Sequence, residues 1–158
     1  MAPYENKVKK YERRPEPGNP AQTEAWALLE AGKRMAMAIT HPSDDQKEIK
    51  NIRKAALRLN WRLWTIFQAE LTTGRSELPE EILINMLTLC RFVDKHTVGA
   101  LVNPTPESMT VLIDINRNIA AGLAQIPEIA ERTAQQTKPQ ADYPQNQPPA
   151  RQDIDTEV

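Results

Sequence analysis

The sequence predicts an all-α protein, a compact four-helix bundle with a flexible N-terminal arm and a disordered C-terminal tail. Apolar residues recur every three or four positions through the middle of the chain, which is the spacing of one helix face. No segment alternates apolar and polar residues as a strand does, and five glycines in 158 residues are few for a turn-rich β fold. Short connections between the predicted helices favour antiparallel packing.

Composition divides the chain into three parts. Residues 1–18 are polar and end in a cluster of prolines and a glycine, so we expect a flexible arm. Residues 19–126 carry the helical pattern and form the predicted domain. Residues 127–158 are rich in proline and glutamine, a composition that buries too little apolar surface to offset the entropy lost on ordering. We therefore expect a disordered tail.

The first two predicted helices are bounded by recognisable end signals. Asn19 and Pro20 place a cap residue before a proline at the first helical position. A His-Pro dipeptide should end this first helix, because the residue before proline avoids the helical conformation. Ser43 is the predicted cap of the second helix, which should run to about Leu71.

The third predicted helix opens near residues 78–81 and runs to about Gly99. The fourth follows Thr105, its predicted cap, and reaches about Gln125, with one or two further turns through IAERTA at 129–134 as the alternative. Residues 82–93 of the third helix are apolar nearly all the way round, which is typical of a central helix packed by the other three. The alternative is that part of this surface stays open as a groove for a partner helix.

Two tryptophans lie three positions apart in the second helix, where the apolar arc is wider than one core needs. Trp64 flanks the apolar stripe and is expected in the core. Trp61 lies beside Arg58 and Arg62, and it is either the edge of the core or an exposed anchor, since tryptophan with arginine is common at binding hot spots. The stripe expected to face the core consists of Ile49, Ile52, Ala56, Leu59, Leu63 and Ile66.

The fourth helix carries one polar residue, Asn116, within its apolar stripe. A buried asparagine without a partner costs about 1–3 kcal/mol, so this side chain should be hydrogen-bonded. Two interpretations stay open: a structural asparagine that fixes how the helices pack, or a polar hook for the backbone of a partner. Nearby, Asp114 and Arg117 are three positions apart and can pair on the helix surface.

The sequence shows no catalytic constellation. Two histidines and one cysteine make no metal-ligand cluster, and no glycine-rich phosphate loop is present. Cys90 lies in an apolar run, where an inert thiol is expected. We expect no enzymatic activity, no cofactor and no metal.

Location and partners are bounded by the same composition. The single cysteine, the lack of a secretory signal and the lack of a long apolar run predict a cytoplasmic protein outside the membrane. A formal net charge of −1 argues against a general affinity for nucleic acid.

Several stretches in a fixed order resemble the family of the flagellar biosynthesis regulator FlaF of α-proteobacteria. They are LNWRLWTIFQAELTTGRSELPEEI at 59–82, LTLCRFVDKHT at 87–97 and LIDINRNIAAGL at 112–123. Residues 19–35 resemble the first helix of that family. The resemblance covers about residues 19–125, so the arm and the tail lie outside it.

The resemblance implies a non-enzymatic role in flagellum biogenesis. It implies that the chain binds flagellin as a cytosolic secretion chaperone and acts with FlbT, which controls flagellin mRNA. The terminal regions of flagellin are amphipathic helices that are unpaired before assembly, and a small helical protein with surplus apolar surface can cover them. The expected partner contacts are Trp61, Trp64, Phe67, Arg58, Arg62, Asp114, Asn116 and Arg117.

Two other functions stay open. A regulator that binds flagellin mRNA directly would use the basic side of the second helix with Trp61 as a stacking platform, and its affinity would fall steeply with salt. A structural subunit would self-associate through the third helix. The basic side consists of Lys47, Lys50, Lys54, Arg58 and Arg62.

Overall fold

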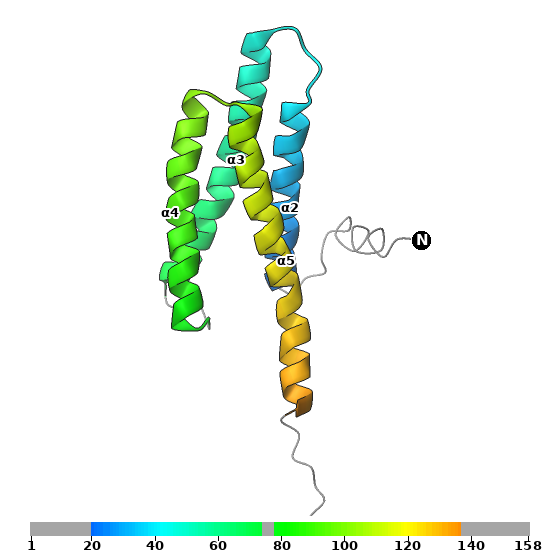
Figure 1. Ribbon diagram of the computed structural model, residues 1–158, viewed down its shortest axis with the longest axis vertical. Helices are drawn as coiled ribbons and strands as arrows, with labels where there is room; N and C mark the ends of the chain where they lie inside the picture. Colours follow the sequence, from blue (N-terminus) through cyan, green and yellow to red (C-terminus); the bar gives the residue numbers. More distant parts are fainter. Residues whose placement is uncertain (1–19, 74–77, 137–158) are drawn as a thin grey trace, which may run out of the picture.

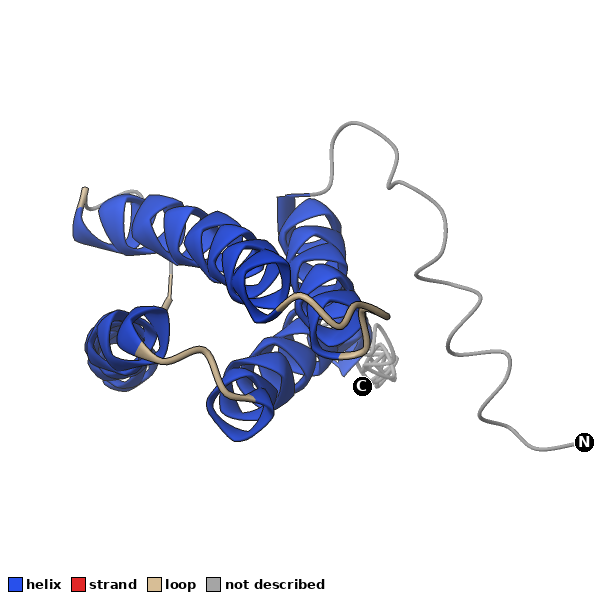
Figure 2. Cartoon of the chain, turned by 90° about the horizontal axis from the view of Figure 1, so that it is seen from above, coloured by secondary structure: helices blue, strands red, loops and turns tan. Residues whose placement is uncertain are grey.

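The protein folds into a bundle of four helices, in which neighbours along the chain run in opposite directions (Figure 1). The computed structural model describes residues 20–73 and 78–136, and within these ranges every regular element is helical (Figure 2). The predicted all-α bundle is confirmed. The arm at 1–18 and the tail after residue 136 lie outside the described residues. The helices are α2 (Pro20–Ile39), α3 (Gln46–Thr72), α4 (Glu80–Val102) and α5 (Pro106–Gln136).

The centre of the bundle is the pair α2 and α5, which make the most extensive contact. α3 packs on α2, α4 packs on α3, and α4 touches α5 only sparsely. Small side chains at Ala25 and Ala120 are buried between the helices, and a Cβ added to Gly32 would lie 3.9 Å from the Cβ of Asn116. These small residues let the backbones of α2 and α5 approach closely.

α4 is therefore an outer helix, and the prediction that its apolar segment forms the centre is wrong. Cys90, Val93, Thr97 and Ala100 face the core. Other large apolar side chains of the same helix stay exposed, because none of the helices α2, α3 and α5 packs on its far side. These exposed side chains are Ile82, Ile84, Phe92, Val98 and Val102.

The face of α3 that packs into the core is turned relative to the predicted stripe. Leu57, Asn60 and Trp64 are buried, whereas Leu59 and Ile66 are exposed to 37% and 49%. The reason is Asn60, a polar residue that the apolar pattern leaves out and that the fold buries completely. Once this position counts as internal, the core face of α3 follows from the helical period.

Helix ends agree with most of the predicted signals. Ser108 N donates to Thr105 Oγ1 at 3.2 Å, so the predicted cap of α5 is confirmed. The predicted cap Ser43 is wrong, because Asp45 caps α3 and its Oδ1 accepts from Lys47 N at 2.9 Å. The Ser43 hydroxyl instead accepts from Asp45 N at 3.1 Å and donates to Glu48 Oε2 at 2.6 Å.

Two helices run further than predicted. α4 continues past Gly99 to Val102, and α5 passes through Pro127 to Gln136. The first part of the predicted tail, residues 127–136, is therefore helical. A proline inside a helix removes one backbone hydrogen bond, but the glutamate, alanine, arginine and glutamine residues that follow are good helix formers.

One arginine joins the two connections at the same end of the bundle. Arg53 Nη1 donates to Pro104 O at 3.1 Å, and Arg53 Nη2 donates to Ile39 O at 3.4 Å. Ile39 ends α2, so the guanidinium group also satisfies a carbonyl at a helix C-terminus. The α4–α5 connection is held in place by this contact.

Candidate partner-binding surface

The predicted contact residue Asn116 lies in a buried polar cluster at the centre of the bundle. Its Nδ2 donates to Leu28 O at 3.0 Å and to Asn60 Oδ1 at 2.7 Å. Trp64 Nε1 donates to Asn116 Oδ1 at 2.9 Å. Both asparagine side chains are fully buried, and Trp64 is 1% exposed. Of the two interpretations of Asn116, the structural one fits this geometry.

Two aromatic contact candidates belong to the same core. Trp64 meets Phe67 edge to face, with ring centroids 6.0 Å apart and an interplanar angle of 81°. Phe67 is buried like Trp64. Trp64, Phe67 and Asn116 are all buried in the core, so these three predicted contacts do not lie on the surface of the bundle.

Trp61 lies at the boundary between α3 and α4. Its side chain is partly buried, and its Nε1 donates to Asp94 Oδ1 of α4 at 2.8 Å. Trp61 is thus the edge of the core, where it ties the outer helix to the bundle. This contact fixes one end of the ring and leaves it less free as a stacking platform.

The four charged candidates are exposed but lie on two separate helices. Arg58 and Arg62 belong to α3, whereas Asp114 and Arg117 belong to α5. α3 and α5 make no extensive contact. Within the described parts of the chain, the only ion pair joins His41 and Glu48, so Asp114 and Arg117 do not pair there. The structure does not bring the predicted contacts together into one site.

A different surface, which the predicted contact set missed, lies along α4. At about 3.6 residues per turn, Ile84, Val98 and Val102 fall on one side of this helix, together with Arg91 and Lys95. All five residues are exposed, and Val102 reaches 74%. We call these five residues the α4 outer face. The sequence feature that could have indicated this surface is the segment 82–93, which is apolar nearly all the way round the helix. An open groove for a partner helix was one interpretation of that segment.

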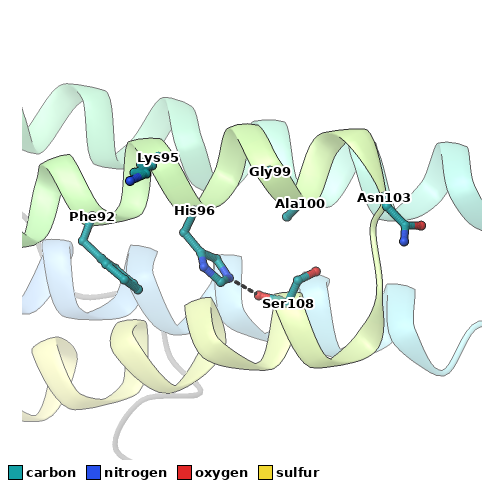
Figure 3. A pocket seen from close by; sticks show the side chains of 7 residues that line it. All are labelled: Phe92, Lys95, His96, Gly99, Ala100, Asn103 and Ser108. Carbon is teal, nitrogen blue, oxygen red and sulfur yellow. Dashed lines mark hydrogen bonds between the residues drawn. The ribbon is translucent and has the colours of Figure 1, made fainter.

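Beside the α4 outer face, an open groove separates α4 from the start of α5 (Figure 3). Its volume is about 440 Å³. We call it the α4–α5 groove. The residues that line it are Phe92, Lys95, His96, Gly99, Ala100, Asn103 and Ser108.

The wall of the groove is held by His96. Its Nε2 lies 2.8 Å from Ser108 O, which it can reach as a hydrogen-bond donor across the groove (Figure 3). Its ring stacks on Phe92, with centroids 5.5 Å apart and an interplanar angle of 21°. Two small residues of α4 line the groove: Ala100 is buried, whereas Gly99 is exposed and a Cβ added to it would meet no atom within 4 Å.

The one cysteine of the chain, Cys90, lies in the core beside Val93. Burial, together with the charge of Asp94, raises the pKa of the Cys90 thiol to about 11, so this cysteine is a poor nucleophile near neutral pH. Among residues 20–73 and 78–136, no three histidine, cysteine, aspartate or glutamate side chains gather as ligands for a metal ion. None of the helices in these ranges has both the length and the hydropathy to cross a bilayer.

The sequence model of one protein family, described as flagellar protein FlaF, matches residues 7–123. The match begins inside the predicted arm, earlier than residue 19, and it ends within α5. Comparisons with curated proteins and with solved structures gave no significant match. Because the family match covers well over half of the chain, including all of α2, α3 and α4, the chain belongs to the FlaF family of flagellar proteins.

Proposed function

We propose that this protein is a non-enzymatic, cytoplasmic factor of flagellum biogenesis that binds flagellin as a secretion chaperone and thereby supports its synthesis and export. Membership of the FlaF family supports the flagellar role. The observation that carries the binding role is the α4 outer face. It combines three exposed apolar side chains with Arg91 and Lys95, on the helix that makes the least contact with the rest of the bundle.

Exposed apolar patches on small proteins usually mark interaction sites. Five large apolar side chains of α4 are more than 45% exposed, and three of them, Ile84, Val98 and Val102, belong to the α4 outer face. Covering them releases about 25 cal/mol for each Å² of apolar surface removed from water. An amphipathic helix of flagellin, unpaired before assembly, has the complementary apolar stripe and would be kept from premature association.

FlbT is the second protein partner in this proposal. The exposed Arg58 and Arg62 lie on α3 rather than on α4, and form no ion pair among the described residues. They are the charged groups that we assign to FlbT. Mixing the chain with flagellin and FlbT, and measuring masses by light scattering, distinguishes a ternary complex from mutually exclusive binding.

Calorimetric titration of purified monomeric flagellin tests the proposal. Val98 is 51% exposed on α4 and Met37 is 61% exposed on α2, so Val98→Gln and Met37→Gln form a matched pair. We expect micromolar binding or better, weakened roughly tenfold by Val98→Gln and unchanged by Met37→Gln. The proposal fails if the wild-type chain does not bind flagellin, and α4 is the wrong surface if both variants bind equally well.

A parallel titration with flagellin mRNA in place of flagellin tests direct binding of RNA. Lys47, Lys50, Arg58 and Arg62 are exposed along α3, so a basic surface exists. Binding to RNA would weaken steeply with salt because each neutralised phosphate releases counterions. A steep salt dependence with mRNA, and no binding of flagellin, would replace the chaperone role by an RNA-binding one.

A further inference from the structure

The α4–α5 groove opens beside the α4 outer face, and Lys95 belongs to both. We propose that this groove is the specificity pocket of the partner surface, and that it receives one large apolar side chain of a helix whose flanking acidic residues pair with Lys95 and Arg91. This inference rests on the proposed function, because it takes the partner to be the helical segment of flagellin.

A glycine, Gly99, lines the groove. Gly99 lies inside α4, where glycine lowers helix stability relative to alanine. A Cβ at this position would meet no atom within 4 Å, so close packing within the described chain does not require a glycine. At Gly32, by contrast, the neighbouring helix comes within 4 Å of the added Cβ. The space above Gly99 is therefore open to a side chain from outside.

The groove is formed before any partner arrives. Its volume of about 440 Å³ falls within the range typical of pockets that bind small groups. His96 is fixed by the contact with Ser108 O and by stacking on Phe92, and Ser108 Oγ donates to Thr105 O at 2.9 Å. Walls that are already ordered lower the entropic cost of binding.

Two basic residues stand at and beside the rim of the groove. Lys95 and Arg91 are four positions apart on α4, are exposed, and form no ion pair among the described residues. Aspartate or glutamate residues one helical turn apart on a partner helix would complement them. A second copy of this chain, docked through the same face, would bring like charges together, which disfavours self-association there.

The steric test fills the groove. We would titrate monomeric flagellin into the wild-type chain and into Gly99→Leu, with Gly122→Leu as the matched control. Both glycines are exposed in helices, and neither added Cβ meets an atom within 4 Å, so both variants should fold at least as stably as the wild type. Gly122 lies about 21 Å beyond Ser108 along α5. We expect Gly99→Leu to weaken binding at least roughly tenfold, and Gly122→Leu to leave it unchanged.

The electrostatic test reverses one charge at the rim. Lys95→Glu should weaken flagellin binding and reduce its dependence on salt, whereas Lys33→Glu, on the exposed side of α2, should change neither. Melting temperatures of all four variants show whether a loss of affinity reflects a loss of fold.

The possible results separate the two proposals. If flagellin binds the wild type, Gly99→Leu and Lys95→Glu with equal affinity, the groove has no role in recognition while the proposed function stands. If flagellin does not bind the wild type, both proposals fail. If the wild type is a dimer by sedimentation and Gly99→Leu is a monomer, a second copy occupies the groove and the inference is overturned.

Discussion

Asn116 Nδ2 donates a 2.7 Å hydrogen bond to Asn60 Oδ1, and so joins α5 to α3 through two fully buried amides. The same Asn116 accepts from Trp64 and donates to the backbone of α2 at Leu28. Three helices thus meet at one side chain. Buried polar groups of this kind specify one arrangement of a core, because any other arrangement leaves them unsatisfied.

Replacing the central amide should be costly. Asn116→Ala removes three hydrogen bonds and leaves the indole N–H of Trp64 and the Asn60 oxygen without partners. We expect the free energy of unfolding in urea to fall by about 2–4 kcal/mol. The control Asn118→Ala, on the exposed side of the same helix, should change it by less than about 0.5 kcal/mol. Equal stability of both variants would contradict the role given to the cluster.

Trp61 should contribute to stability rather than to binding. Trp61→Phe removes the 2.8 Å hydrogen bond to Asp94, which is partly exposed to water, so we expect a loss of about 0.5–1.5 kcal/mol. Trp61→Ala should cost more, because it also removes packing between α3 and α4. Melting curves and flagellin titrations of both variants check this. A large loss of affinity with an unchanged melting temperature would make Trp61 a binding anchor instead.

Glu24 should make the protein more stable in mild acid. Burial raises the pKa of this carboxyl above 4.5, and the charge of Glu70 raises it further. Between the unfolded and the folded pKa, the native state binds more protons, so the free energy of unfolding falls as the pH rises through that window. Glu24→Gln should raise the melting temperature near neutral pH and flatten the pH profile. An unchanged pH profile would show that the fold does not raise the pKa of Glu24.

Cys90 should report on unfolding. Because burial raises the pKa of its thiol to about 11, the group stays protonated and shielded at mildly alkaline pH. We expect slow reaction with a disulfide reagent in the native state and fast reaction in urea, with a midpoint equal to that of the circular dichroism signal. Native and unfolded chains that react equally fast would place this thiol on the surface.

Much of the fold could be predicted because its signals are local. Proline at the start of α2 and threonine before α5 mark helix ends through their own backbone chemistry. The arrangement of the helices could not be predicted in this way, because it depends on contacts between residues that are far apart in the sequence. Which helix is central depends on how closely two backbones can approach, and Ala25, Gly32 and Ala120 settle this only once α2 and α5 are known to be partners.

The site was harder to predict for a related reason. An aromatic residue on an amphipathic helix can be buried in its own core or against a partner, and the helical pattern is the same in both cases. Trp64 and Phe67 proved to be core. The bundle does have more large apolar side chains than its own core uses, but most of the exposed ones lie on α4, where Val98 and Val102 remain in water.

Amide hydrogen exchange tests most directly whether flagellin binds on α4. Exchange would be measured by mass spectrometry on the chain alone and on its mixture with excess monomeric flagellin. We predict slower exchange in peptides that cover residues 84–102 when flagellin is present. Peptides from α3 that contain the exposed Ile66 should exchange at an unchanged rate. Protection of α3 without protection of α4, or no protection anywhere, would contradict the account.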